Sequence, residues 1–268
     1  MNILNLSGKS SGTVTLPPIF DTPFRKDVIR NVYKILNTHK FQPQGRHPTA
    51  GMDVVADSND PPTGRGVSRI VKMRGGGGGR QGQAGEVASI RGGRQAHPPK
   101  VEKVIYKKIN KKEKLFALCS AIAVTSSKDI VESRGHKVEK IKDFPPIVSD
   151  DIESVKTAKQ MKEVLNSLNL TDDVKRLESR RVRFGKPALR GRGKKVGKSV
   201  LFVVNDSKML TKACGGFPGV DVRMASDLSV LDSAPGSDTI RLTVYTKGAL
   251  DTISKIKSPL LELAAKLN

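Results

Sequence analysis

Residues 64–112 read GRGVSRIVKMRGGGGGRQGQAGEVASIRGGRQAHPPKVEKVIYKKINKK. This stretch has 13 lysine or arginine residues against 2 glutamates, so it carries +11, half of the formal net charge of +22. It also holds 11 of the 25 glycines, and no aromatic residue lies between Phe41 and Tyr106. Such a composition cannot bury enough apolar surface to offset the entropy that is lost on ordering. We therefore expect it to form no core of its own and to become ordered against a polyanion.

A second basic segment lies at 180–198 and reads RRVRFGKPALRGRGKKVGK. It has nine basic residues and no acid, so the two segments together account for +20 of the net charge and leave +2 for the rest. This distribution predicts a near-neutral globular body with two cationic extensions. A pI near 10.1 indicates a polyanionic partner, with nucleic acid favoured over an anionic membrane surface.

Length and composition restrict the class of protein. The 268 residues suffice for one large or two small domains. No run of 18 apolar residues and no signal-type N-terminal stretch occur, so we expect neither a transmembrane nor a secreted protein. Cys119 and Cys214 are too few for a disulfide framework and lack zinc-site spacing, and Cys119 falls in an apolar helical pattern typical of a buried free thiol. These features predict a cytoplasmic location.

The apolar pattern predicts an α/β fold. We expect strands at 3–6, 13–16, 147–148, 199–204, 219–223 and 242–245. We expect helices at 25–38, 154–168, 171–181 and 207–213, a partly helical stretch at 225–231, and a terminal helix that begins near Lys247. A further helix should begin at a capping box formed by Asn110 and Glu113 and end among 125–128, unless residues 129–133 continue it. The run SVLFVV at 199–204 is typical of a strand that is covered on both faces.

Strands and helices alternate after residue 144, which favours βαβ units and a mainly parallel sheet flanked by helices. We therefore predict one globular α/β domain over 1–268, interrupted by a long extended basic loop at 42–109. A loop of that length inside a compact domain implies a function of its own.

Two glycine-rich motifs imitate nucleotide-binding loops. Gly77, Gly79 and Gly82 satisfy G-x-G-x-x-G by spacing, but basic, glycine-rich sequence lies on both sides where a core strand and a helix are needed. Residues 193–199 imitate a phosphate-binding loop, but they are one residue short and precede the apolar strand instead of following it. We expect no nucleotide site at either place.

No catalytic or metal-binding constellation stands out. The four histidines are scattered and have no metal-ligand spacing, so we expect exposed or RNA-facing imidazoles; they are His39, His47, His97 and His136. The pairs Asp150–Asp151 and Asp172–Asp173 resemble strand-end and helix-start acids. We predict no enzymatic activity, no metal and no cofactor.

The basic segments carry the functional signal. Arginine forks grip phosphates, and glycine lets the backbone approach them closely. The basic loop lacks aromatic stacking platforms, so single-strand binding of the OB-fold or RRM type is poorly supported. The pattern suits threading between structured RNA helices. A solvated non-specific tail is the alternative, but both segments are internal instead of terminal.

Several motifs resemble the archaeal and eukaryotic form of the universal large-subunit ribosomal protein four family. They are LPPIFDTPFRKDVI at 16–29, GGRQAHPPK at 92–100, the helix at 110–122, Arg134–Gly135–His136, IVSDD at 147–151 and RGRGK at 190–194 before the SVLFVV strand. They cover nearly the whole chain in order, and the length and termini are closer to archaeal members.

The resemblance implies a structural constituent of the large ribosomal subunit, with its α/β domain on the solvent side. It also implies an internal loop that penetrates the large-subunit rRNA, supports assembly and reaches the polypeptide exit tunnel with its tip near 74–83. The implied rRNA-binding residues are Arg65, Arg69, Lys72, Arg74, Arg80, Arg91, Arg94, His97, Lys100, Arg190, Arg192, Lys194 and Lys195. The implied tip residues are Arg74, Gly77, Arg80 and Gln81, where five consecutive glycines depart from the family pattern.

The expected partners are large-subunit rRNA, neighbouring ribosomal proteins and the nascent peptide near the loop tip, with no membrane and no homo-oligomer. Two other functions compete. An RNA methyltransferase with an Arg-Gly-rich extension would need a glycine-rich turn directly after an early core strand, and neither 147–148 nor 199–204 is followed by one. A DNA-compacting protein would have to prefer duplex DNA over structured RNA.

Overall fold

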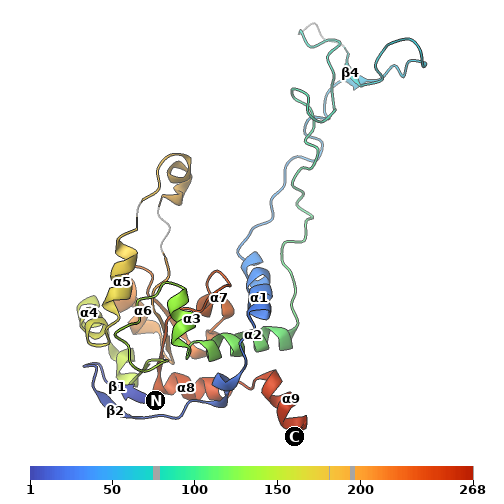
Figure 1. The fold of residues 1–268 in the computed structure, drawn as a ribbon. Coiled ribbons are helices and arrows are strands. Elements are labelled where there is room, and N and C mark those ends of the chain that lie inside the picture. Colours follow the sequence, from blue (N-terminus) through green and yellow to red (C-terminus); the bar gives the residue numbers. More distant parts are fainter. Residues whose placement is uncertain (75–78, 181, 194–196, 268) are drawn as a thin grey trace. The chain divides into compact units, whose positions relative to one another are not determined.

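The computed structural model describes residues 1–74, 79–180, 182–193 and 197–267. The chain divides into two compact units (Figure 1). One unit, called the body below, comprises Met1–Asn37 and Lys108–Asn268; the other, called the loop unit, comprises Thr38–Lys107.

The body is built on a six-stranded sheet in the order β2-β1-β5-β8-β6-β7. The strands are β1 Asn2–Leu4, β2 Ser10–Thr13, β5 Ile147–Val148, β6 Leu201–Val204, β7 Asp221–Met224 and β8 Thr243–Thr246. Only the β1–β2 pair is antiparallel, and every other pair is parallel. The prediction of an α/β fold with a mainly parallel sheet is confirmed.

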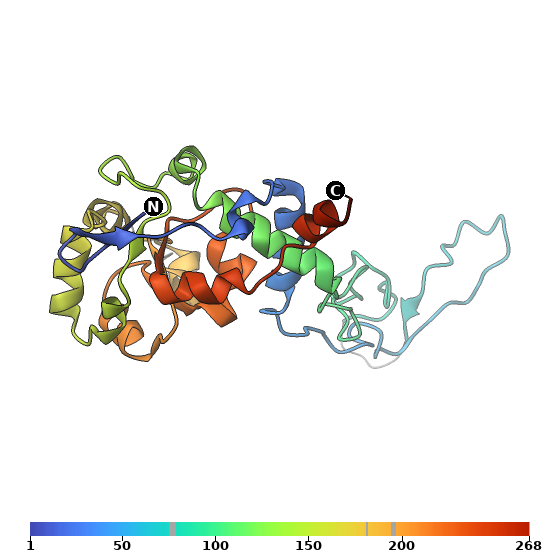
Figure 2. The same ribbon diagram turned by 90° about the horizontal axis from the view of Figure 1, so that it is seen from below.

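Helices cover both faces of this sheet. They are α1 Lys26–Thr38, α2 Lys111–Val124, α3 Lys128–Ser133, α4 Ala158–Ser167, α5 Thr171–Glu178, α6 Lys208–Cys214, α7 Val230–Ser233, α8 Lys247–Ser254 and α9 Pro259–Leu267, with 3₁₀ turns at Pro18–Asp21, Asp150–Ser154 and Ala225–Asp227. Figure 2 shows α2 and α8 on the same side of the body. A further layer of packing joins α1, α2 and α7.

The central strands explain why their sequence is apolar without alternation. On β6, Phe202 and Val204 pack with α4 and α6, whereas Leu201 and Val203 pack with α2 and α8. All four side chains are buried. A strand with helices on both faces needs an apolar residue at every position, which is the pattern read at 199–204.

The N-terminal hairpin differs from the prediction. The second strand is Ser10–Thr13 instead of 13–16, and its residues are exposed at the sheet edge. A tight turn sets this register. The Gly8 N–H donates to the Asn5 carbonyl and the Asn5 N–H donates to the Lys9 carbonyl, both at 2.8 Å, and Gly8 has a φ of +76°; this turn brings Ser10 opposite Leu4. The apolar side chain of Val14 instead packs onto the core beneath α2 and α8.

One helix cap and one helix start also differ from the prediction. The capping box at Asn110 and Glu113 is wrong: α2 begins at Lys111, but Asn110 makes no side-chain cap and the Glu113 carboxylate accepts a 2.7 Å hydrogen bond from Asn31. The helix expected at 154–168 is α4, which begins only at Ala158 because Thr157 and Gln160 form a capping box there.

Breaks divide two other predicted helices. The chain leaves the helical path after Val124 and begins α3 at Lys128, so the possible continuation to 133 is a separate helix. The terminal helix begins at Lys247 as predicted but ends at Ser254, and α9 follows it.

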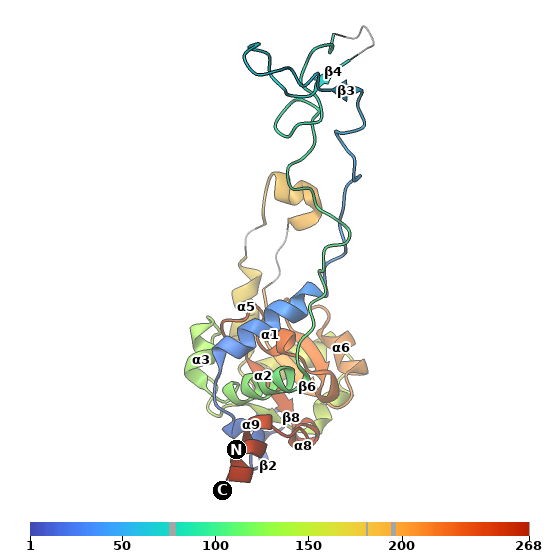
Figure 3. The same cartoon turned by 90° about the vertical axis from the view of Figure 1, so that its right-hand side faces the viewer.

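The loop unit has more local order than its composition predicts. Strands β3 Ala56–Asp57 and β4 Lys72–Met73 pair in antiparallel fashion, and Lys72 also pairs with Ala84 (Figure 3). Among the described residues of this unit, however, no hydrophobic side chain is buried. Backbone pairing gives the unit its form, and no hydrophobic core supports it.

Candidate nucleic-acid interface

The basic residues predicted in the loop unit face solvent. Eight of the nine are exposed and Lys72 is half-buried; the nine are Arg65, Arg69, Lys72, Arg74, Arg80, Arg91, Arg94, His97 and Lys100. Because their charges are not desolvated by the protein itself, they are available to a polyanion.

Two of these cations are held by the loop unit itself. Arg74 lies 3.1 Å from Asp57, and Arg69 lies 3.6 Å from Asp60 and donates to the carbonyl of Pro61. The other seven have no acidic partner among the described residues. Arg69 and Arg74 therefore stabilise the β3–β4 region, whereas the remaining lysines and arginines of the set have no acid of this unit against them and are available to a partner.

Backbone hydrogen bonds close the base of the loop tip. Met73 donates to Gln83 at 2.8 Å and accepts from Gly82 at 3.0 Å, and Gly85 donates to Val71 at 2.9 Å. Arg80 and Gln81 are exposed beyond this closure. Gly77, the remaining predicted tip residue, lies outside the described residues.

Two stretches of the loop unit, one at 46–52 where the chain enters it and one at 93–102 where the chain returns, lie against each other and are called its two legs below. They line a pair of adjoining hollows of about 250 and 230 Å³. They bring Lys100 and Arg94 together with Arg46 and His47. The Arg46 guanidinium donates to Gln95 at 2.9 Å, and its backbone N–H donates to Pro99 at 3.3 Å.

Sequence reasoning missed Arg46, whereas His47 is exposed, as was expected of it. A signal was present, because His47–Pro48 repeats the His97–Pro98 dipeptide of the opposite leg.

The middle of the second basic segment, from Arg183 to Gly193, forms a closed turn. The Arg183 N–H donates to the Gly193 carbonyl at 2.8 Å, and Arg190 and Arg192 lie exposed in the stretch Ala188–Arg192, whose coiled backbone is kinked at Arg190 and Gly191. Lys194 and Lys195, predicted to bind with them, lie outside the described residues. Arg183 and Lys186 are exposed in the same turn, so four of the six described cations of the segment are gathered there.

A buried polar cluster anchors both ends of this segment. Asp173 of α5, before the segment, accepts from the hydroxyl of Ser199 at 2.5 Å and from Arg176 at 3.0 Å. Arg176 also donates to the carbonyl of Lys198 at 3.2 Å. Although burial raises the pKa of Asp173, hydrogen bonds from His136, Ser199 and Arg176 hold that pKa well below its ordinary value.

His136 belongs to this cluster, so the expectation of an exposed or RNA-facing imidazole is wrong for it. Its side chain is fully buried, with Nδ1 3.0 Å from Asp173 and Nε2 3.4 Å from the backbone N–H of Leu242. These partners assign the hydrogen to Nδ1 and leave Nε2 as an acceptor. Burial lowers the pKa of His136, which favours this neutral form.

The cluster is no catalytic triad. His136 and Ser199 both donate to the same carboxylate of Asp173, so the imidazole is not placed to take the serine proton. All three side chains are also inaccessible. Their arrangement fixes the chain and does not perform a reaction.

A second ionic group ties the neighbouring strands together. Arg241, buried before β8, lies 2.6 Å from Asp221 of β7 and donates to the carbonyls of Val200 and Gly219 at 2.8 and 2.6 Å. Lys198 binds the same Asp221 carboxylate at 2.7 Å. Although burial raises the pKa of Asp221, the two cations hold that pKa below its ordinary value.

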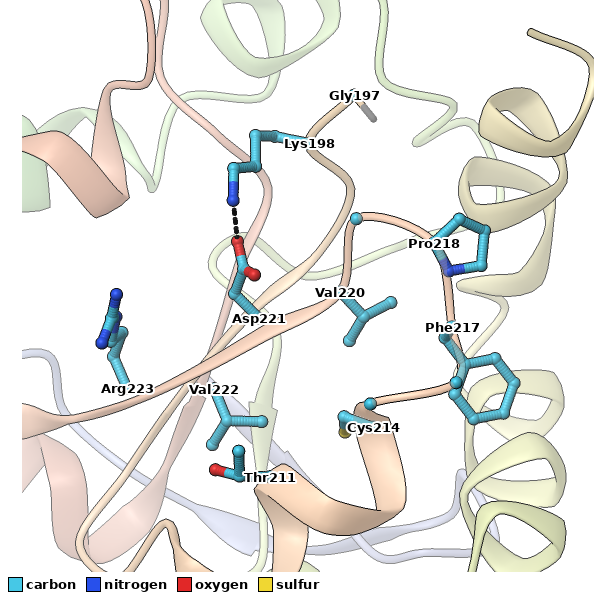
Figure 4. A pocket seen from close by; sticks show the side chains of 13 residues that line it. Gly197, Lys198, Thr211, Cys214, Phe217, Pro218, Val220, Asp221, Val222 and Arg223 are labelled. Atoms are coloured by element: carbon cyan, nitrogen blue, oxygen red, sulfur yellow. Dashed lines mark hydrogen bonds and ion pairs between the residues drawn. The ribbon is translucent and has the colours of Figure 1, made fainter. Parts of the chain in front are cut away.

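Figure 4 shows the pocket beside this ion pair, a hollow of about 580 Å³ between α6 and β7. Burial raises the pKa of the Cys214 thiol to about 12, so it is protonated and inert at neutral pH. Asp221 is engaged by Lys198 and Arg241. In the part of the chain that the structure describes, no group of three or more His, Cys, Asp or Glu side chains could hold a metal ion.

Cys119 and Cys214 are both buried and unpaired, as predicted for Cys119. Asp172 and Asp173 lie in the first turn of α5, and Asp150 and Asp151 follow β5, as expected of helix-start and strand-end acids. None of the described helices is long and apolar enough to cross a bilayer.

Comparison with known proteins decides the family. The sequence matches the description "Ribosomal protein L4/L1 family" over residues 14–256. The chain belongs to the ribosomal protein L4/L1 family. The resemblance described from the motifs is thereby confirmed, and a ribosomal protein family is not a family of enzymes.

Members of the L4/L1 family from archaea are similar over nearly their full length. The large ribosomal subunit protein uL4 of Methanococcus aeolicus is 40% identical over 256 residues, which are 95% of this chain and 98% of that protein. Its counterpart in Sulfurisphaera tokodaii is 40% identical over 95% of this chain and 93% of that protein. The protein from Methanosphaera stadtmanae is 35% identical over 96% of each. The chain is an L4/L1 protein of the archaeal type, and as a ribosomal component it works in the cytoplasm.

Proposed function

We propose that the protein is a structural constituent of the large ribosomal subunit that binds large-subunit rRNA through its loop unit and its second basic segment. One observation supports this above all others: five exposed cations predicted in the loop unit lack an acidic partner among the described residues, on a backbone without a buried hydrophobic side chain; they are Arg65, Arg80, Arg91, Arg94 and Lys100. Phosphates of folded RNA supply both the neutralising charge and the enclosing surface that such a backbone needs.

The second contact is made by Arg190 and Arg192, together with Lys194 and Lys195 of the same segment. The cluster around Asp173 holds both ends of the segment, so its turn is presented by a rigid base. Pre-organised cations lose less entropy on binding than cations on a mobile tail do.

Protease sensitivity tests this proposal. In the free chain, residues 45–105 should be cleaved rapidly while the body resists, and assembly into large subunits should protect them. The native chain should also sediment with large subunits after a high-salt wash, together with the neighbouring ribosomal proteins. A loop unit that resists proteolysis without RNA would count against the proposal.

Salt dependence gives a residue-level test. Arg91→Ala should reduce the slope of log affinity against log salt for large-subunit rRNA by about 1, because one phosphate contact is lost. Lys9→Ala, an exposed cation on the N-terminal turn of the body, is the matched control and should leave the slope unchanged.

We further propose that the tip, with Arg74, Arg80 and Gln81, reaches the wall of the polypeptide exit tunnel and approaches the nascent peptide. The support is the exposure of these side chains beyond the closure at Met73 and Gln83, together with the family resemblance. A photo-crosslinker at Gln81 should capture a stalled nascent chain on the ribosome. The same crosslinker at Arg190 should not.

A further inference from the structure

The two most exposed large hydrophobic side chains in the described chain lie in the turn of the second basic segment. Phe184 is 86% exposed and Leu189 is 87% exposed. Covering the apolar faces of an aromatic ring this exposed is favourable in water, so the ring offers a contact surface to a partner that binds this turn.

The turn holds the ring in a defined place. Gly185, with a φ of +73°, accepts backbone bonds from Ala188 at 2.9 Å and Leu189 at 3.2 Å. The bond from Arg183 to Gly193 closes the chain on the other side. Phe184 therefore lies in a closed turn between Arg183 and Gly185, each of which makes backbone hydrogen bonds within the turn.

The surrounding charge identifies the kind of partner. The sequence has no acid between Glu178 and Asp206, and Arg183 and Lys186 on either side of the ring have no acidic partner among the described residues. An apolar protein surface would desolvate these cations without compensation. Unpaired nucleotides offer both a flat apolar face for a ring and phosphates for the flanking cations.

We propose that Phe184 stacks on one unpaired base of structured RNA, while Arg183 and Lys186 bind the adjoining phosphates. This rests on the proposed function, since the RNA is the large-subunit rRNA of that proposal, and it adds a base-stacking contact to what the segment otherwise offers as charge alone.

Substitutions at Phe184 separate stacking from charge. With deproteinised large-subunit rRNA as the probe, Phe184→Ala should weaken binding about 10-fold, since base–aromatic stacking is worth about five- to 150-fold in affinity. Its salt slope should equal that of the unchanged chain, because no phosphate contact is lost, whereas Arg190→Ala should lower the slope by about 1. Phe184→Trp should bind as well as the unchanged chain.

Two matched variants test the shape of the contact. Phe184→Leu keeps apolar area but loses the flat ring, so it should bind nearly as weakly as Phe184→Ala. Leu189→Ala, at an equally exposed position in the same turn, should change affinity by less than about threefold. Chemical probing should reveal one base that is protected by the unchanged chain and by Phe184→Trp and becomes reactive with Phe184→Ala, within an otherwise unchanged footprint.

Each contrary result points elsewhere. If the unchanged chain does not bind the rRNA, the proposed function fails. If it binds but Phe184→Ala binds equally well, the stacking proposal is refuted while the proposed function stands. If Phe184→Leu binds the rRNA normally while Leu189→Ala binds weakly, Phe184 and Leu189 serve an apolar protein surface and this inference is wrong. If the chain binds anionic vesicles in a way that depends on Phe184, the two side chains serve a membrane surface and the inference is wrong as well. Circular dichroism of each variant verifies that the body remains folded.

Discussion

The body contains three clusters of buried hydrophobic side chains, whereas the described residues of the loop unit contain no buried hydrophobic side chain. The loop unit is also the more basic for its length: it carries +7 over 70 residues, against +6 over the 179 residues of the body outside the second basic segment. The body is stabilised by burial of its own apolar surface. The described residues of the loop unit are held by hydrogen bonds and a few ion pairs without a buried apolar core, so its stability must come from what binds it.

The largest difference between the two regions should appear on truncating a side chain in each. Phe202→Ala on β6 should lower the free energy of unfolding by about 4 kcal/mol, because it leaves a cavity between the sheet and its helices. Val104→Ala in the loop unit, where the side chain is 78% exposed, should change it by less than about 0.5 kcal/mol. Urea denaturation of both variants measures this. Equal losses would mean that the loop unit has a hydrophobic core after all.

A smaller loss should follow from breaking the buried cluster beneath the second basic segment. Asp173→Ala should cost about 3 kcal/mol, because Arg176 and Ser199 would lose their shared acceptor inside the body. The exposed ion pair of Arg25 with Asp27 provides the control, since Asp27→Ala should have little effect. A loss at Asp173 no greater than that at Asp27 would contradict the anchoring role.

The close approach of the two legs can be tested without touching a charge. Gly51 has a φ of +84°, and a Cβ there would lie 2.5 Å from the backbone of Gly93. Gly51→Ala should lower rRNA affinity about 10-fold, or about 1.4 kcal/mol, by forcing the legs apart. Gly66→Ala is the matched control, because its φ is also positive (+66°) but nothing lies within 4 Å of the added Cβ. Neither change should alter the unfolding of the body, and equal losses of affinity would exclude the close approach as the cause.

The smallest expected effect is a pH dependence that belongs to the body alone. His136 has a lowered pKa in the folded chain, so below about pH 6.5 the unfolded chain binds a proton that the folded chain does not. The stabilising contribution is therefore present above this pH and is lost as the pH falls. Between pH 7 and pH 5.5 we expect a loss of stability of up to about 1 kcal/mol, which His136→Gln should abolish. If the free energy of unfolding varies with pH in the same way for the unchanged chain and for His136→Gln, His136 does not take up a proton on unfolding. Asp173 acts in a separate window below about pH 4, because its pKa is lowered as well.

The sequence predicts those parts of the fold that burial dictates. The apolar runs at β6 and β8, and the helical periodicity of α1 and α5, correspond to observed elements within a few residues. β2 escaped prediction because it is an exposed edge strand of serine, glycine and threonine whose register comes from the turn before it. The pairing of β3 with β4 depends on backbone bonds between residues without a common apolar face, so hydrophobic pattern carries no sign of it.

The candidate site was predictable as charge but not as geometry. Composition alone located both basic segments. The association of Arg46 with Gln95 across the two legs depends on chain reversal, which residue counts do not contain. His136 illustrates the opposite limit: a polar residue outside any apolar pattern looked exposed, yet it is buried because Asp173 and the backbone of Leu242 satisfy both of its ring nitrogens.

The position of β8 in the sheet has a consequence for biosynthesis. This strand lies between β5 and β6 but is the last strand of the chain, ending at Thr246 of 268 residues. The two halves of the sheet cannot join until it has been translated, because β5 and β6 have no direct pairing. During synthesis the cationic loop unit therefore emerges well before the domain that carries it can close, and for that interval it is open to any polyanion in the cell.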